Sequence, residues 1–288
     1  MSSYNLKRLL QPKSIALFGG LWIENVANQI KNSNFKGNVW PINPHRKSIA
    51  GYKCFQDISD LPGVPDTAFI GVNRTKTLEI LTKLNEVGCG GATCFAAGFS
   101  EVDKYGKQLQ KKLSKASKDM PFLGPNCYGY INYLDHIHMW PDQHGGKEVE
   151  KGVAIIAQSS NIAINLTMNT RSTPIAYVLT TGNQAKIDMS DLGLAMINDK
   201  RVTAIGIYIE GFKDIKKFEK MAFSALRSNI PIVVLKSGKT DLSKKQSFSH
   251  TASITGDSDI SSAFLKRLGI VEVDDLELFL ETLKVLNF

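Results

Sequence analysis

The sequence contains no long uninterrupted run of apolar residues. None of its apolar runs approaches the roughly 20 residues that a membrane-spanning helix needs. Its first ten residues contain neither the apolar stretch nor the cleavage site of a secretory signal. The hydrophobic fraction of 43% and the charged fraction of 22% are typical of a soluble globular protein. We therefore expect a cytoplasmic protein with no membrane partner.

Cysteine is scarce, and its spacing excludes the common metal and redox motifs. The four cysteines form no C-x-x-C pair and are Cys54, Cys89, Cys94 and Cys127. In a cytosolic chain such residues are reduced thiols. His136 and His138 alternate as metal ligands on a strand would, but no cysteine or carboxylate cluster completes a site. The sequence predicts no bound metal.

Acidic residues are outnumbered by basic ones. The chain has 35 Lys and Arg residues against 27 Asp and Glu residues, which gives a formal charge of +8. The basic residues are scattered rather than gathered in one arm, a pattern that disfavours nucleic acid as a partner. A groove for a polyphosphate ligand and an ordinary solvated surface both fit this charge.

Short apolar runs alternate with amphipathic stretches through the first half of the chain. The strands predicted there are Ser14–Phe18, Asn38–Ile42, Thr67–Val72, Gly91–Phe95 and Met120–Leu123. Helices are predicted near Asn25–Ser33 and over Thr75–Val87 and Asp103–Lys118. Strands separated by helices of this length favour a parallel sheet with right-handed crossovers.

The alternation stops near Tyr130 and resumes near Gly152. The strands predicted after the break are Gly152–Ala157, Ile175–Leu179, Ala204–Ile209, Pro231–Leu235 and Val271–Val273. The helices are Ile162–Met168, Asp188–Ile197, Lys213–Arg227, Asp259–Leu268 and Leu276–Leu286. The chain is also longer than one core usually organises. We therefore predict two α/β domains, over residues 1–130 and 151–288, joined by a linker over 131–150.

In sheets of this kind, ligands bind beyond the carboxyl ends of the strands. Gly19 and Gly20 follow the first strand, where glycine lets the backbone approach a phosphate or simply makes a tight turn. His45, Arg46 and Lys47 follow the second strand and suit an anionic ligand or a solvated surface. Both interpretations stay open on the residues alone.

Hydroxyl-bearing residues follow later strands. Ser159 or Ser160 begins a helix after Ala157 and could cap it or hold a phosphoryl group. His250 stands among small and hydroxyl residues in SFSHTASITG, with Lys244 and Lys245 before it. A lone histidine is more often structural than catalytic, although histidine is also the commonest general acid or base.

Several of these motifs together resemble one family. GPNC, the serine-rich turn, Gly182-Asn183, Glu210-Gly211, the Lys-Ser-Gly after the later strand, and Ser249-His250-Thr251 occur in the order found in NDP-forming acyl-CoA synthetases. The resemblance runs from about Ser14 to the end of the chain and is to the alpha-subunit half of the family, which includes succinyl-CoA synthetase. It implies a Rossmann-like CoA-binding domain followed by a flavodoxin-like ligase domain.

The resemblance also implies roles for individual residues. His250 corresponds to the histidine that is phosphorylated during the reaction, and Glu210 to the carboxylate that orients its imidazole. Ser159, Ser160 and Asn161 correspond to the helix start that holds the phosphoryl group. The residues that correspond to CoA contacts are Gly19, Gly20, Leu21, Pro44, Arg46, Lys47, Val72, Asn73, Ala96, Ala97, Asn126 and Cys127.

The family implies partners as well. Its members join a small carboxylic acid to coenzyme A and use ATP or GTP with Mg²⁺ at an ATP-grasp domain, which this sequence does not resemble anywhere. We therefore expect an ATP-grasp domain or subunit as a partner, and an oligomer. The chain would be either a separate alpha-like subunit or a piece of a longer fused polypeptide.

Two other interpretations compete with this one. A dinucleotide-dependent dehydrogenase would need a fuller glycine fingerprint and an acidic residue after the second strand. The chain has Asn43-Pro44-His45-Arg46 there instead. A non-catalytic CoA-binding regulatory module would keep CoA affinity and lose phosphorylation, so the region of His250 decides between it and the enzyme.

Overall fold

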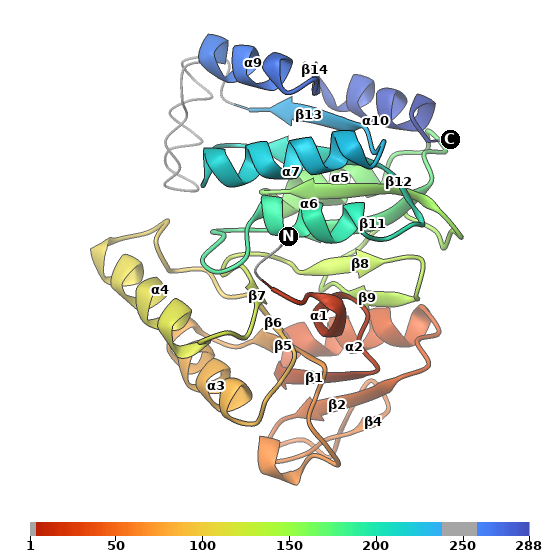
Figure 1. Cartoon of the computed structure of the whole chain (residues 1–288). Helices are drawn as coiled ribbons and strands as arrows, with labels where there is room; N and C mark the ends of the chain where they lie inside the picture. Colours follow the sequence, from red (N-terminus) through yellow and green to blue (C-terminus); the bar gives the residue numbers. More distant parts are fainter. Residues whose placement is uncertain (1–3, 238–257, 288) are drawn as a thin grey trace. The chain divides into compact units, whose positions relative to one another are not determined.

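A computed structural model of the 288-residue chain describes residues 4–237 and 258–287 (Figure 1). The chain divides into two compact units. The N-terminal unit comprises the described residues up to Gln143 together with Gly182–Ile187. The C-terminal unit comprises His144–Thr181 and the described residues from Asp188 onward. Within the described ranges, none of the helices combines the length and the apolar character needed to cross a bilayer.

The N-terminal unit is built on a five-stranded parallel sheet. Its strand order is β2-β1-β5-β6-β7. The strands are β1 (Ser14–Gly19), β2 (Asn38–Ile42), β5 (Thr67–Gly71), β6 (Ala92–Cys94) and β7 (Phe122–Leu123). The helices are α1 (Lys7–Leu10), α2 (Leu21–Asn32), α3 (Arg74–Glu86) and α4 (Lys104–Ala116). The predicted doubly wound α/β topology is confirmed.

The direction in which the chain crosses the sheet decides which helices cover which face. From β1 the chain passes through α2 to β2 at one edge, and from β5 it passes through α3 and α4 toward β7 at the other. Right-handed crossovers in opposite directions put the helices on opposite faces. Figure 1 shows α2 on one side of this sheet and α3 with α4 on the other. The direction in which the chain moves along the sheet therefore reverses between β1 and β5.

Smaller elements complete the N-terminal unit. They are the hairpin of β3 (Ser48–Ile49) and β4 (Tyr52–Lys53), the 3-10 turn η1 (Ile58–Asp60), and the hairpin of β8 (Tyr130–Asn132) and β9 (Ile137–Met139). The stretch 131–150, predicted to be a connection, thus contains most of a buried antiparallel hairpin. Its strands are three residues long and buried on both faces, so they show no alternation of apolar and polar residues.

The C-terminal unit has parallel strands in the order β14-β13-β12-β10-β11. They are β10 (Gly152–Ala157), β11 (Ile175–Thr180), β12 (Val202–Ile209), β13 (Ile232–Lys236) and β14 (Val271–Val273). The helices are α5 (Ser160–Thr167), α6 (Met189–Ile197), α7 (Ile215–Arg227), α9 (Ser258–Arg267) and α10 (Leu276–Val285). This is the order of a flavodoxin-like sheet, as predicted, and it reverses between β10 and β12.

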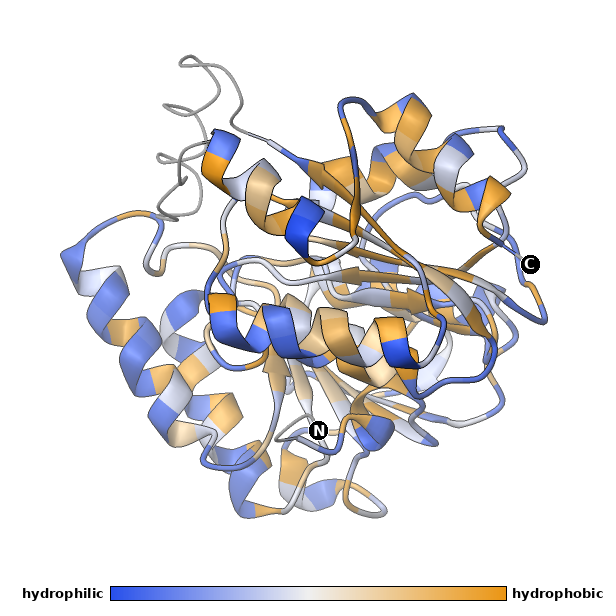
Figure 2. Cartoon of the chain, turned by 45° about the horizontal axis from the view of Figure 1, so that its top comes forward, coloured by the Kyte–Doolittle hydropathy of each residue, from blue (hydrophilic) through white to orange (hydrophobic). Residues whose placement is uncertain are grey.

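The strands of both units are almost wholly apolar because helices cover both of their faces. All six residues of β10 and all six of β11 are buried. Figure 2 shows strands that are mostly hydrophobic and helices that carry both colours. The helix α4 has only three buried residues (Gly106, Leu109 and Leu113) among many lysines, so its outer face is solvated.

Two predicted boundaries shift at the starts of helices. The helix predicted near Asn25 begins at Leu21, directly after Gly20. The helix predicted from Ile162 begins at Ser160, because the Ser159 hydroxyl accepts a hydrogen bond from the Ile162 N–H and caps it. Both helices therefore start immediately beyond a strand end, where their first N–H groups lie closest to the ligand edge of the sheet.

A buried ion cluster joins α6 to α7 in the C-terminal unit. The Lys217 Nζ lies 3.1 Å from the Asp188 Oδ2 and 2.5 Å from the Asp191 Oδ2. Both carboxylates are buried, and Asp188 also caps α6 through the Ser190 and Asp191 N–H groups. Burial lowers the pKa of Lys217, but the hydrogen bonds and charges of the two aspartates outweigh it, so the pKa is raised overall.

Gly19 should not tolerate a side chain. Its φ of +144° is one that L residues rarely adopt, and a Cβ would lie 2.6 Å from the Gly71 carbonyl oxygen. We expect Gly19→Ala to destabilise the protein by about 1–3 kcal/mol, measured by urea unfolding. Gly20→Ala is the matched control, because a Cβ there would have no neighbour within 4 Å. Equal stability of the two variants would contradict the expected close approach.

Lys217→Met should destabilise the C-terminal unit by about 3 kcal/mol, because it removes the cation that bonds to two buried carboxylates. The raised pKa of Lys217 sets the pH dependence. The stability that Lys217 contributes is fully present below the unfolded pKa of about 10.4 and is lost as the pH rises through the higher folded value. Urea unfolding of wild type and variant between pH 7 and 11.5 checks this.

The exposed neighbour Lys216 supplies the control for this measurement. Lys216→Met should change the stability by less than about 0.5 kcal/mol at any pH. A difference between wild type and Lys217→Met that stays constant up to pH 11.5 would show that charge on Lys217 is not what stabilises the cluster.

Candidate functional site

A cavity of about 500 Å³ opens at the carboxyl ends of β1, β2 and β5. This is where the strand order of the N-terminal unit reverses, the place at which open α/β sheets bind ligands. Its lining residues are Phe18, Gly19, Gly20, Ile42, Asn43, Pro44, His45, Asp57, Ile58, Val72, Asn73, Lys76, Ile80 and Lys83. The lining combines apolar side chains and glycine with three residues that can carry positive charge.

Asn43 connects two of the loops around this cavity. Its Nδ2 donates a hydrogen bond of 2.7 Å to the Gly19 carbonyl, and its Oδ1 accepts one of 2.9 Å from the His45 N–H. Gly19 in turn lies so close to Gly71 that only glycine fits. The rim of the cavity is therefore fixed by backbone contacts between strand ends.

The predicted CoA contacts divide into two groups. Five of them line the cavity, namely Gly19, Gly20, Pro44, Val72 and Asn73. Leu21, Arg46 and Lys47 follow on adjacent positions but are not among its lining residues. Leu21 is 70% exposed, and the Arg46 guanidinium pairs with Glu24 at 2.6 Å.

The other predicted CoA contacts lie beyond β6 and β7. The Asn126 N–H donates a hydrogen bond of 2.9 Å to the Ala96 carbonyl, and Cys127 is buried. Asn126 has a φ of +60°, a conformation in which asparagine is enriched. The exposed Ala97 follows Ala96. These residues hold two neighbouring turns together and do not line the cavity.

Sequence reasoning missed the basic face of α3. Asn73, Lys76, Ile80 and Lys83 follow one another at intervals of three, four and three residues and all line the cavity. This spacing places the four residues on one side of a helix. It is the sequence pattern from which the basic face could be predicted. The Lys83 Nζ lies 3.1 Å from the Asp57 Oδ2, and this hydrogen bond lowers the pKa of Asp57.

Gln158 and Glu210 meet where the strand order of the C-terminal unit reverses. Gln158 follows β10 and Glu210 follows β12, and both are buried. The Gln158 Oε1 accepts hydrogen bonds from the Glu210 N–H at 2.5 Å and from the Gly211 N–H at 3.0 Å. A buried glutamate thus stands at the carboxyl edge of the sheet, next to the start of α5.

The predicted phosphate-binding residues form the start of α5. Ser159 is its N-cap, and Ser160 and Asn161 are its first two residues. A helix start presents free N–H groups and a partial positive charge, both of which suit an anion. The Ser159 hydroxyl caps the helix, so the capping interpretation of this serine is the one seen in the structure.

The next strand end contributes a buried lysine. Lys236 ends β13 and is buried, and its Nζ donates a hydrogen bond of 3.0 Å to the Ser237 carbonyl. The Ser237 N–H donates one of 2.9 Å to the Ile209 carbonyl, directly before Glu210. Burial raises the pKa of the neighbouring Tyr208. His250, the predicted phosphorylated histidine, lies outside the described residues.

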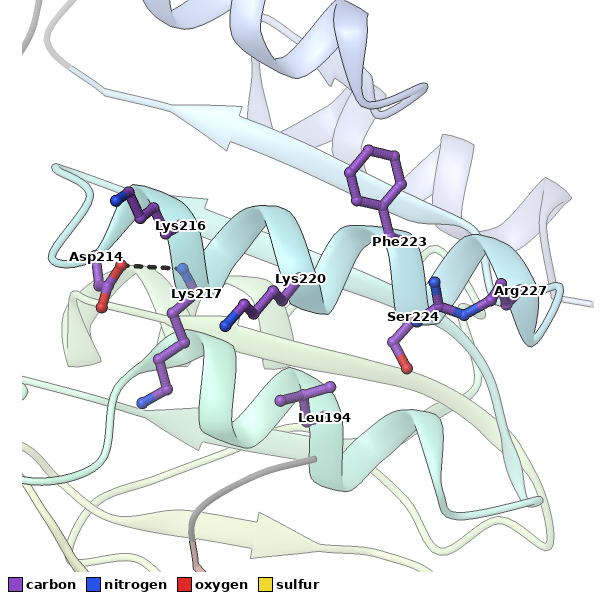
Figure 3. A pocket seen from close by; sticks show the side chains of 8 residues that line it. All are labelled: Leu194, Asp214, Lys216, Lys217, Lys220, Phe223, Ser224 and Arg227. Atoms are coloured by element: carbon purple, nitrogen blue, oxygen red, sulfur yellow. Dashed lines mark hydrogen bonds between the residues drawn. The ribbon is translucent and has the colours of Figure 1, made fainter.

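A further cavity of about 600 Å³ lies against α7 (Figure 3). It is lined by Leu194, Asp214, Lys216, Lys217, Lys220, Phe223, Ser224 and Arg227. None of these was predicted as a site residue. Figure 3 shows Asp214 at the start of α7, where its side chain accepts a hydrogen bond from the Lys217 N–H.

Comparison with known proteins identifies both units. The model of a CoA binding domain matches residues 13–133, and the model of a succinyl-CoA ligase-like flavodoxin domain matches residues 150–286. An ADP-forming acetate–CoA ligase from Methanocaldococcus jannaschii is 34% identical over 282 residues. Subunit alpha of ADP-forming acetate–CoA ligase II from Pyrococcus furiosus is 28% identical over 284 residues.

A solved structure is also similar. It is a dinucleotide-forming acetyl-coenzyme A synthetase 1 from Candidatus Korarchaeum cryptofilum, in complex with phosphate and ADP, with 30% identity and a TM-score of 0.89. The match covers 98% of this chain and 62% of that one.

The relatives are longer than this chain. The match covers 95% of this chain but 39% of the M. jannaschii ligase, and 94% of this chain but 60% of the P. furiosus subunit. With both domain models matched in sequence, and with both sheets doubly wound as predicted, the chain belongs to the ADP-forming acyl-CoA synthetase family, of which it carries the CoA-binding domain and the succinyl-CoA ligase-like flavodoxin domain.

Proposed function

We propose that this chain is the CoA-binding and phosphohistidine-carrying part of an NDP-forming acyl-CoA synthetase. The overall reaction converts an acid, CoA and NTP into acyl-CoA, NDP and phosphate. The observation that carries the proposal is the placement of Glu210 and the start of α5 together at the strand-order reversal of the ligase-like unit. That is where a phosphorylated histidine would need a carboxylate and an anion-binding helix.

The cavity of the N-terminal unit supports binding of CoA. Gly19 and Gly20 line it without side chains, so the backbone there can approach a phosphate. Lys76 supplies positive charge, Lys83 lines the cavity beside its partner Asp57, and Ile58 and Ile80 supply apolar surface. These residues fit a ligand that has both phosphates and a base. CoA, when bound, supplies the thiol that becomes acylated.

Glu210 and the α5 start would support a phosphorylated histidine in complementary ways. The reaction is reversible, and in the direction that starts from acyl-CoA an imidazole nitrogen of His250 attacks the phosphorus of an acyl phosphate. The carboxylate of the acid then leaves and the ring becomes cationic. A buried carboxylate from Glu210 stabilises that cation and fixes the ring's orientation. The first backbone N–H groups of α5, at Ser160 and Asn161, would lie near the phosphoryl oxygens and offset their charge.

The same proposal names the partners. An ATP-grasp domain or subunit would bind ATP or GTP with Mg²⁺ and exchange the phosphoryl group with His250. A small carboxylic acid is the second substrate, and the assembly is an oligomer in the cytoplasm. Relatives named as alpha subunits support a divided enzyme.

Phosphorylation of His250 is the decisive test. The chain, mixed with an ATP-grasp partner, γ-labelled ATP and Mg²⁺, should acquire phosphate that is acid-labile and base-stable. His250→Ala should remain folded and bind CoA but acquire no label. CoA binding by wild type with no label in the presence of an active partner would favour a non-catalytic CoA-binding module instead.

Lys76 should contribute to CoA affinity. Removing one charge from a phosphate-binding cavity should weaken binding by roughly 10- to 150-fold, the effect of one hydrogen bond to a charged group. Titration calorimetry of Lys76→Ala with CoA measures this. Lys36→Ala is the matched control, because Lys36 is exposed and precedes β2, at the opposite ends of the strands. Equal weakening of both variants would indicate non-specific charge and not a site.

A further inference from the structure

Gln158 lies at the point where β10 stops pairing with β12. Its own N–H donates a hydrogen bond of 3.2 Å to the Tyr208 carbonyl, which continues the parallel ladder one residue beyond the strand. The chain then turns away into α5, which begins at Ser160. The next acceptor in the ladder would be the Gln158 carbonyl, but the Glu210 N–H bonds to the Gln158 side chain instead.

The side chain of Gln158 takes the place of a backbone acceptor for the segment that follows Ile209. Its Oε1 accepts from the N–H groups of Glu210 and Gly211, at 2.5 and 3.0 Å. Gln158 is 4% exposed, so these bonds form away from water. Two buried N–H groups are satisfied by one amide oxygen.

The other side of the same segment is also held. The Ser237 N–H donates to the Ile209 carbonyl at 2.9 Å, from the end of β13. The backbone around Glu210 is thus fixed by Ser237 before it and by Gln158 at and after it. Gly211 follows immediately, and glycine is the residue with the greatest backbone freedom. The two N–H groups belong to the peptides on either side of the Glu210 Cα, so Gln158 fixes both. Without this acceptor both peptides can rotate, and the direction in which the Glu210 side chain leaves the backbone changes.

We propose that Gln158 is a positioning residue for the carboxylate of Glu210. This inference rests on the proposed function, in which Glu210 supports the phosphorylated histidine. Gln158 acts only through the backbone of Glu210 and Gly211 and does not touch the reacting atoms. Its amide suits the position because it is a neutral acceptor, whereas a carboxylate there would add a second negative charge beside Glu210.

A double-mutant cycle tests the inference in the full chain with an ATP-grasp partner. The rate at which label from ATP appears on the protein is compared for wild type, Gln158→Met, Glu210→Gln and the double variant. Methionine keeps the length of glutamine and removes the acceptor. We expect Gln158→Met to slow labelling by roughly 10- to 100-fold, the cost of misplacing a catalytic group. In the Glu210→Gln background the same substitution should have almost no further effect.

Gln29→Met is the matched control. Gln29 also bonds to a backbone group, since its Nε2 donates to the Asp142 carbonyl at 2.7 Å, but it lies on α2 in the N-terminal unit. It should label at the wild-type rate. Circular dichroism and CoA binding show whether each variant is folded. If Gln158→Met does not fold, Gln158→Asn enters the same cycle, because its amide is one methylene too short to reach both N–H groups.

The outcomes separate the two claims. Slow labelling of Gln158→Met that is not additive with Glu210→Gln supports the positioning role. Labelling at the wild-type rate, or effects that multiply independently, overturns that role and leaves the phosphohistidine in place. Absence of label on wild type defeats the proposed function itself.

Discussion

The handedness of the crossovers between parallel strands is the constraint on which both candidate sites depend. A right-handed crossover fixes the face on which each helix packs, so a chain that changes direction along a sheet must switch faces. At the switch, the carboxyl ends of two neighbouring strands are left uncovered by the helices that leave them. In the N-terminal unit this happens between β1 and β5, and in the C-terminal unit between β10 and β12. The residues proposed to bind CoA and to support the phosphohistidine lie at these two places.

The two edges are then completed by different means. In the N-terminal unit, close contacts of the glycine backbone hold the edge together. Gly19 approaches Gly71 more closely than any side chain would allow, and Asn43 connects its loop to Gly19. In the C-terminal unit, a side chain substitutes for backbone, since Gln158 satisfies the N–H groups that follow β12. Binding of a phosphate requires backbone N–H groups that the ligand can reach, as proposed for the N-terminal unit. Support of a histidine by a carboxylate requires that the carboxylate be held in one orientation, as proposed for the C-terminal unit.

Much of this could be predicted from particular residues. The apolar runs at Ser14, Thr67, Gly152 and Ala204 each became a strand because strands covered on both faces must be almost wholly apolar. The short hairpin of β8 and β9 could not be predicted, because strands of three buried residues show no alternation of apolar and polar side chains. The helix that follows Gly20 begins four residues before its predicted start near Asn25. Leu21 and Trp22 carry no capping signal and are exposed, so the sequence pattern does not mark this start.

The two doubly wound domains, the family resemblance and the loops after the strands can be read from the amino-acid sequence, because these depend on local apolar patterning and on short motifs. Which of those loops share a cavity becomes known only when the strands are placed side by side. In the structure, Gly19, Pro44 and Asn73 line the cavity, whereas Asn126 and Cys127 do not. Lys76 and Lys83 also line it. Gln158 bonds to the backbone of Glu210. Residues 52 positions apart meet because the strands before them are neighbours in the sheet, and no local pattern records which strands pair.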